Sequence, residues 1–172
     1  MLAIKGLAQD LVYVEPKSPR ADLMAAVPSG SLPTLMERDV ALYEARIIAE
    51  YLDERFPHPP LPPSDPLGRA RTRLTAFRIG RDWLGVLELA RQNNSDAGSA
   101  RAQLRAALVE SEAVFRIGKY FLSNEISLAD CLVLPLLWRL HSVGIPLREL
   151  GAGLDTYAHK LVSDAALAEG LV

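Results

Sequence analysis

The residues in this chain that could carry nucleophilic or metal chemistry are few. The single cysteine, Cys131, follows the start of an apolar helical stretch, and a helix N-terminus can lower the pKa of a thiol. Free cysteines are among the most often buried residues, however, and this favours a structural role. The three histidines, His58, His141 and His159, have no metal-ligand spacing with one another or with Cys131. The sequence therefore predicts no metal site.

Asp130 is a further candidate for chemistry, but its neighbours favour another role. Ser127 and Asp130 form an S-x-x-D pattern just before the apolar run at 131–138. In this capping pattern each side chain satisfies a backbone N–H that the first turn of a helix leaves free. We therefore expect Ser127 and Asp130 to be a helix cap, and we predict no catalytic residue.

Composition and charge narrow the class of protein. The 172 residues are 49% hydrophobic and 23% charged, with a net charge of −2. Residues 67–119 contain 10 basic and 5 acidic groups, between two acidic flanks. This distribution suits a polar contact face better than binding to a phosphate backbone. One cysteine excludes an internal disulfide, and the longest apolar run, CLVLPLLW, is too short to span a bilayer. We expect a soluble, cytoplasmic protein.

The pattern of apolar residues changes from mixed to purely helical along the chain. The stretch FPHPPLPPSDP at 56–66, which contains six of the twelve prolines, separates the two patterns. We predict an α/β domain over 1–55, a linker over 56–66 and an all-α domain over 67–172. In the first part we expect a helix ending near Gly6, a strand at 10–15, a weak helix at 19–27, a hairpin at 32–43 and a helix at 44–55. In the second part we expect helices at 66–91, 100–115 and 127–140.

Two of these helices have a predicted apolar face. In the helix at 44–55, Ile47, Ile48, Tyr51 and Leu52 fall on one side, which should be the buried one. The helix at 66–91 repeats apolar residues at a helical spacing, which indicates a core-facing stripe. This stripe consists of Leu67, Ala70, Leu74, Phe77, Leu84 and Leu87.

The order of these elements resembles the glutathione transferase fold. The resemblance rests on S-L-P-T-L at 31–35, Y-E-A-R-I-I-A-E-Y-L at 43–52, L-P-P-S-D-P at 61–66 and S-L-A-D-C at 127–131. It implies a thioredoxin-like N-terminal domain followed by an α-helical bundle, with Pro33 as a structural cis-proline. Proteins of this fold have a first strand before the point that matches Met1, so we expect the N-terminal domain to be incomplete here.

Within that superfamily the chain is most similar to the stringent starvation protein A family of bacterial regulators. The runs that carry this similarity are EYLDERFPHPPL at 50–61 and KYFLSNEISLADCLVLPLLWRL at 119–140. The resemblance implies a non-enzymatic dimer, with an identical or a paralogous subunit, that binds RNA polymerase holoenzyme and its sigma factor. It implies no cofactor and no membrane, and nucleic acid only through the polymerase. It also implies that Pro57, His58 and Pro59, here called the Pro-His-Pro surface, contact the partner.

Several alternatives remain open from the sequence. A glutathione-dependent transferase would hold glutathione at a Glu-Ser pair, but this chain has Glu44–Ala45 and so lacks the hydroxyl. A fold remnant without activity is a third hypothesis. The proline segment itself could be only a stiff joint. Arg69 and Arg73, one helical turn apart, are either part of a solvated helix face or flanking contacts of a docking surface.

Overall fold

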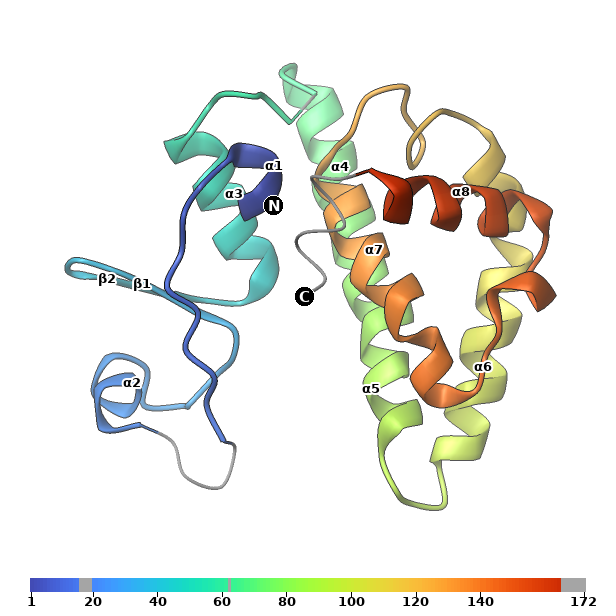
Figure 1. Cartoon of the computed structure of the whole chain (residues 1–172), viewed down its shortest axis with the longest axis horizontal. Coiled ribbons are helices and arrows are strands. Elements are labelled where there is room, and N and C mark those ends of the chain that lie inside the picture. Colours follow the sequence, from blue (N-terminus) through green and yellow to red (C-terminus); the bar gives the residue numbers. More distant parts are fainter. Residues whose placement is uncertain (16–19, 62, 165–172) are drawn as a thin grey trace. The chain divides into compact units, whose positions relative to one another are not determined.

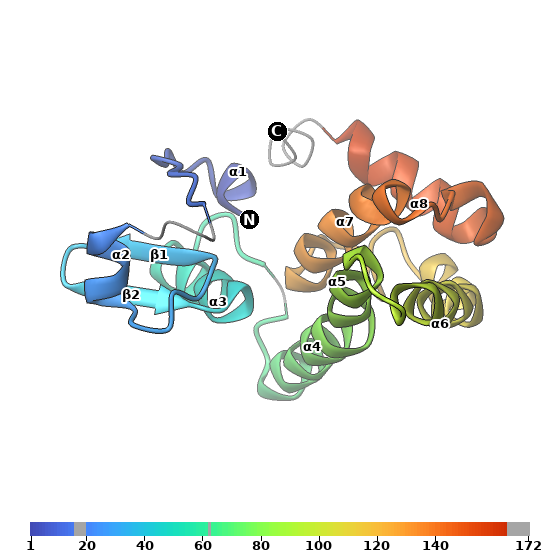
Figure 2. The ribbon, with the colours of Figure 1, turned by 90° about the horizontal axis from the view of Figure 1, so that it is seen from below.

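The computed structural model describes residues 1–15, 20–61 and 63–164. The chain divides into two compact units, Met1–Pro60 and Leu61–Val172, which are drawn in Figure 1 and, from another side, in Figure 2. The division falls inside the proline-rich segment.

The first unit is a small α/β structure. Its sheet is a hairpin of β1 (Thr34–Glu37) and β2 (Val40–Tyr43), which pair antiparallel with Thr34 opposite Tyr43. At the turn Arg38 has a positive φ of 50°. Helix α3 (Ala45–Arg55) packs against both strands, as Figure 2 shows. The short helices α1 (Leu2–Lys5) and α2 (Ala21–Ala26) complete the unit.

The predicted strand at 10–15 is wrong. Residues 10–14 have an irregular backbone, and among the described residues the sheet consists of β1 and β2 alone. Leu11, Val12 and Tyr13 are 63%, 56% and 85% exposed. Only Glu15, at the end of the stretch, takes part in a β-bridge. An alternating pattern becomes a strand only where a neighbouring strand accepts its hydrogen bonds, and the described sheet of β1 and β2 does not include residues 10–14.

The predicted apolar face of α3 is only partly correct. Leu52 is buried, together with Ala49, but Ile47 is 42% exposed. Tyr51 donates a hydrogen bond from its hydroxyl to Glu37 Oε2 of β1 at 2.9 Å. Because a two-stranded hairpin covers only a narrow strip of a helix, part of the apolar face remains uncovered.

In the described part of the second unit, the regular elements are all helices. Helix α4 (Pro66–Arg78) continues through a π-helical segment, Ile79–Leu84, into α5 (Gly85–Arg91), and these lie end to end in Figure 2. Helix α6 (Ala97–Glu110) packs on α5, and α7 (Leu128–Arg139) packs on α4 and on α8 (Ala152–Ser163). Short 3-10 turns at Glu112–Arg116, Leu140–Val143 and Leu147–Glu149 connect them.

The core of the second unit is rich in leucine and contains one aromatic cluster. Trp83, Phe115, Phe121 and Tyr157 contact one another with ring centroids between 5.2 and 6.4 Å apart. These rings come from the π-helical segment, a 3-10 turn, a loop and α8, so the cluster joins parts of the unit that are distant in sequence. The side chains exposed by less than 2% include Leu87, Leu104, Leu108, Val133, Leu136, Leu140, Leu150, Leu154 and Leu161.

The predicted core stripe of the helix at 66–91 is wrong at its N-terminal end. Leu67 and Leu74 are each 60% exposed, whereas Leu87 is fully buried. The side of α4 that is less exposed carries small residues, including Gly68 and Ala76, and small side chains allow α7 to pack closely. The π-helical segment then changes the angular spacing of residues, so one stripe cannot continue along the whole helix.

Candidate partner-binding site

The Pro-His-Pro surface follows directly after the last turn of α3. Pro57, His58 and Pro59 are all exposed, while Phe56 before them is half-buried. The His58–Pro59 peptide bond is cis. Helix α3 ends at Arg55, and prolines have no N–H with which to continue it, so the chain leaves the helix here in an irregular conformation.

A buried lysine, Lys5, binds the backbone on both sides of Pro57 and His58. The side chain of Lys5 is 0% exposed, and its ammonium lies 2.5 Å from Asp53 Oδ1 in the last turns of α3. The same ammonium donates to the carbonyl of Phe56 at 2.8 Å and to that of Pro59 at 2.6 Å. An ammonium has three donors, and all three are satisfied here. The backbone on each side of Pro57 and His58 is therefore fixed while their side chains stay exposed.

Sequence reasoning missed Lys5, although a signal was present. Lys5 is the only charged residue among the first nine, in the apolar stretch MLAIKGL. Gly6 follows it with a φ of 63° and ends α1 in the left-handed conformation that glycine adopts without strain. A lone charge in an apolar stretch is either exposed or buried with partners, and nothing local indicates that those partners are 48 to 54 residues away.

The residues that correspond to a glutathione site lie in the same unit. The Leu32–Pro33 bond is cis, and Pro33 directly precedes β1. Glu44 is the N-cap residue of α3 with a φ of 73°, and it makes no side-chain capping hydrogen bond. Ala45, the first residue of the helix, is exposed and has no hydroxyl. The positive end of α3 therefore lacks a side-chain hydroxyl donor at this position.

Ser127 and Asp130 form the capping box of α7. Asp130 Oδ2 accepts from the backbone N–H of Ser127 at 2.8 Å, and Ser127 Oγ accepts from Ala129 N–H at 3.2 Å. Asp130 is fully buried and also accepts from Phe121 N–H at 2.8 Å and from the Tyr157 hydroxyl at 2.6 Å. Burial raises the pKa of Tyr157, and the neighbouring Asp130 carboxylate raises it further. This arrangement is that of a structural carboxylate joining three segments.

The other candidate residues lie at separate places in the second unit. Arg69 and Arg73 are exposed on α4, and Cys131 is half-buried in the first turn of α7. His141 and His159 each place Nδ1 within hydrogen-bonding distance of a backbone carbonyl on their own segment. Among the described residues, no group of three or more histidines, cysteines and carboxylates is arranged to hold a metal ion. Over the same residues, none of the helices combines the length and apolar character needed to cross a bilayer.

Both units match known protein families. The family model described as glutathione S-transferase, N-terminal domain, matches residues 1–55, and the one described as glutathione S-transferase, C-terminal domain, matches residues 74–158. A stringent starvation protein A homolog from Pasteurella multocida is 45% identical over 154 residues, which cover 88% of this chain and 72% of the relative. The homolog from Haemophilus ducreyi is 42% identical over 147 residues, covering 84% and 69%. The chain belongs to the stringent starvation protein A family.

Solved structures show the same fold at lower identity. The omega 3C glutathione transferase of Trametes versicolor superposes with a TM-score of 0.81 at 23% identity, covering 96% of this chain and 78% of that one. The bacterial transferase BphK gives a TM-score of 0.86 at 20% identity, covering 99% and 90%. The predicted fold class, a glutathione transferase-like α/β domain followed by a helical bundle, is confirmed, as is the predicted family.

Proposed function

We propose that this member of the stringent starvation protein A family is a non-enzymatic transcription regulator that binds RNA polymerase holoenzyme and its sigma factor. The contact is made by the Pro-His-Pro surface, Pro57, His58 and Pro59. The observation that carries the proposal is that these three residues are exposed while Lys5 holds the carbonyls of Phe56 and Pro59. In this proposal the protein acts in the cytoplasm, needs no cofactor and meets nucleic acid only through the polymerase.

A surface held in this way is suited to binding a protein. Prolines have little conformational freedom, and the anchored backbone loses little more when a partner docks. His58 offers an imidazole that can donate and accept a hydrogen bond, between two apolar proline rings. Association therefore gains contact area and one polar contact at a small cost in conformational entropy.

A glutathione-dependent transferase is the second candidate, and the match to both transferase domains favours it. Against it stand Ala45 and the absence of a side-chain cap at the start of α3. The two candidate functions predict different results in one assay, which measures conjugation of glutathione to an electrophilic aromatic substrate. We expect a rate equal to background and no new activity in the Ala45→Ser variant. Turnover that saturates with glutathione would favour the transferase.

The test of the proposal is polymerase binding by a variant in which Pro57, His58 and Pro59 are all alanine. We expect this variant to lose binding to purified holoenzyme in a pull-down and to lose its effect on transcription in vitro. Its melting temperature should be nearly unchanged, because exposed side chains contribute little to the core. His58→Ala alone should weaken binding by about 1–2 kcal/mol, the contribution of one interfacial hydrogen bond.

Two controls separate binding from folding. His159→Ala removes another exposed histidine, on α8 in the second unit, and should bind like the parent. If the prolines act only as a stiff joint, the triple variant should instead melt at a lower temperature and bind in proportion to the folded fraction. A folded triple variant that binds holoenzyme normally would remove this surface from the proposal.

A further inference from the structure

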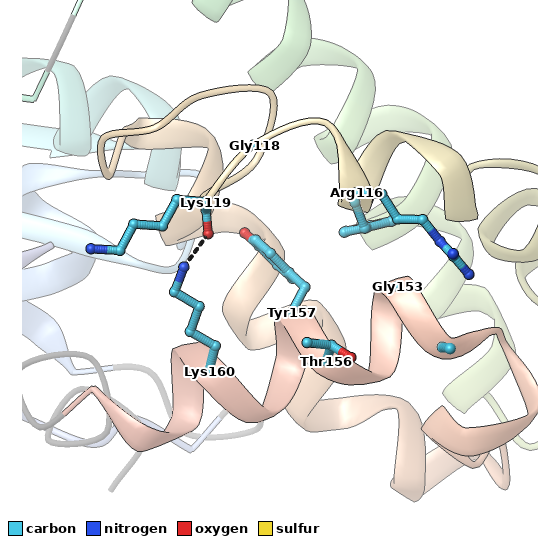
Figure 3. A pocket seen from close by; sticks show the side chains of 9 residues that line it. Arg116, Gly118, Lys119, Gly153, Thr156, Tyr157 and Lys160 are labelled. Atoms are coloured by element: carbon cyan, nitrogen blue, oxygen red, sulfur yellow. Dashed lines mark hydrogen bonds between the residues drawn. The ribbon is translucent and has the colours of Figure 1, made fainter.

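Two of the cavities in the described part of the helical unit lie against α8, and their linings differ. Figure 3 shows the first, of about 360 Å³, on the side of α8 that carries Thr156 and Lys160. Lys160 donates to the carbonyl of Lys119 at 2.5 Å, the dashed bond in Figure 3, and Arg116 pairs with Glu112 at 2.6 Å. The Lys119 ammonium is directed away from Lys160 in the same view. The charges drawn there are therefore not gathered around one ligand position.

The second cavity, of about 320 Å³, is lined by seven apolar residues and two histidines. Three lining residues, Leu137, Ile145 and Ala158, are buried, whereas Trp138 and Val162 are 46% and 48% exposed. The cavity therefore extends from the core of the unit to its surface, which makes it a concave site rather than a flat apolar face. The complete lining consists of Leu137, Trp138, His141, Ile145, Pro146, Leu147, Ala158, His159 and Val162.

The two histidines of this lining are held by hydrogen bonds to the backbone. His141 Nδ1 lies 2.5 Å from the carbonyl oxygen of Trp138, and His159 Nδ1 lies 2.8 Å from that of Asp155. Because a carbonyl oxygen only accepts hydrogen bonds, each Nδ1 carries a proton, and a neutral ring then has no charge to offer. Among the lining residues that the structure describes, none is a lysine, an arginine or an acid. A charged ligand would thus find no fixed counter-charge here.

Trp138 gives the cavity an aromatic wall. Its ring meets the His141 ring edge to face, with centroids 5.9 Å apart and an interplanar angle of 79°. This contact positions the indole while nearly half of Trp138 remains exposed. A second ring that covers the exposed part gains free energy from apolar burial and from the contact between the two rings.

We propose that this cavity binds a small uncharged aromatic molecule, which packs against Trp138. The volume of about 320 Å³ lies at the lower end of the range of small-molecule sites, so it suits one or two fused rings. A carboxylate or an ammonium would lose its hydration on entry without gaining an ionic partner, which excludes charged ligands. The site shares no residue with the Pro-His-Pro surface, so it is a binding function separate from partner contact.

Titration of the full chain with indole tests this site. Affinity is measured by calorimetry at about pH 8, where imidazole groups are ordinarily neutral. The side-chain N–H signals of the two tryptophans are followed by NMR. We expect saturable binding, with a shift of the Trp138 signal and none of the signal of Trp83, which lies in the aromatic cluster of the core.

Two further compounds test the chemical class of the ligand. Cyclohexanol, which is uncharged but not aromatic, should bind several-fold more weakly than indole. An aromatic pair contributes about 0.5–1.5 kcal/mol beyond its buried area, and 1.4 kcal/mol is a factor of ten. Indole-3-acetate keeps the ring but adds a carboxylate, and it should bind about tenfold more weakly or less tightly still.

Matched variants locate the binding. Val162→Phe places a larger side chain in the lining and should weaken indole binding about tenfold or more by filling the cavity. Leu89→Phe makes a similar change at an exposed position of α5, outside the lining, and should leave the affinity unchanged. Should Val162→Phe fold poorly, Trp138→Leu provides the same test, with an expected loss of about twofold to tenfold.

Several results would overturn the proposal. They are equal affinities for indole and cyclohexanol, a shift of the Trp83 signal instead of the Trp138 signal, and normal binding by a folded Val162→Phe protein. An indole affinity that falls as the protein concentration rises would show that a second copy of the chain covers the cavity. That result would also overturn a small-molecule site.

Discussion

Among the described residues, each of the two units contains one buried charged side chain, and these two charges have different surroundings. Counting backbone and side chain together, Lys5 in the first unit and Asp130 in the second are 7% and 0% exposed. Lys5 has an ionic partner, Asp53, and two backbone carbonyls. In the part of the chain that the structure describes, Asp130 has no ion-pair partner and accepts hydrogen bonds from backbone N–H groups and hydroxyls.

The size of the apolar core in each unit explains why the two buried charges have different partners. In the described part of the first unit, the buried apolar side chains are Leu23, Val27, Ala49 and Leu52. The second unit buries apolar side chains from several helices, among them Leu87 of α5, Leu104 of α6 and Leu154 of α8. A small unit gains little free energy from apolar burial, so polar contacts determine more of its shape. Lys5 thus fixes an exposed segment, whereas Asp130 joins segments that the core already holds.

The largest effect is expected from Asp130→Ala. Removing the carboxylate leaves the N–H groups of Phe121 and Ser127 and the Tyr157 hydroxyl buried without an acceptor, and each such donor costs about 1–3 kcal/mol. We expect the free energy of unfolding in urea to fall by about 3 kcal/mol or more. Ser127→Ala should cost only about 1 kcal/mol, as for an ordinary cap.

Glu125→Ala is the control for Asp130→Ala, because it removes an exposed carboxylate from the loop before α7. It should change the unfolding free energy by less than about 0.5 kcal/mol. Equal losses in Asp130→Ala and Ser127→Ala would mean that Asp130 is no more than a helix cap. The contrast between the two buried charges would then be smaller than the structure indicates.

A smaller loss of stability is expected from Lys5→Met, which keeps the aliphatic stem but removes the ammonium. We expect the unfolding free energy of the first unit to fall by about 1–3 kcal/mol, since Asp53 is partly exposed and can be solvated. The variant should also lose polymerase binding, although Pro57, His58 and Pro59 are unchanged. Binding is measured by the holoenzyme pull-down. Normal binding by a folded Lys5→Met protein would show that the segment needs no anchor.

The Glu112–Arg116 pair should give the second unit an acid-dependent contribution to stability. Hydrogen bonds from the Arg116 guanidinium, and then from Gly153 N–H, hold the pKa of Glu112 below its ordinary value. The contribution is present at neutral pH and is lost as the pH falls from the ordinary glutamate pKa through the lower folded-state value. In Glu112→Gln we expect urea midpoints to change less over this range than in the parent. Parallel pH profiles of the urea midpoint in Glu112→Gln and in the parent would contradict this prediction.

The smallest effect on the isolated subunit is expected from Leu74→Glu. Leu74 is exposed on α4, so the charge should change subunit stability by less than about 0.5 kcal/mol. If the chain forms the dimer that the family resemblance implies, and α4 contributes to it, sedimentation should show a shift from dimer to monomer, because an unpaired charge would be buried at the interface. Leu89 is exposed on α5, and Leu89→Glu is the control variant for Leu74→Glu in the sedimentation measurement. A dimer that persists in Leu74→Glu would place the interface elsewhere.

The sequence by itself determined the features that depend on neighbouring residues. The S-x-x-D pattern marked the start of α7, and the run of helical spacing at 44–55 marked α3. The two family-specific runs around Pro57–Pro59 and Ser127–Asp130 led to the family. These signals are local because a helix satisfies its own hydrogen bonds within one turn.

Only the tertiary structure decided the features that depend on distant partners. The stretch DLVYVE did not become the predicted strand, because a strand needs a neighbouring strand to pair with. Leu74 lies outside the core because α7 packs on the opposite side of α4, where the side chains are small. Lys5 contacts Asp53, 48 residues away, and Asp130 contacts Tyr157, 27 residues away. A buried charge requires partners wherever the chain brings them, and sequence spacing does not contain that information.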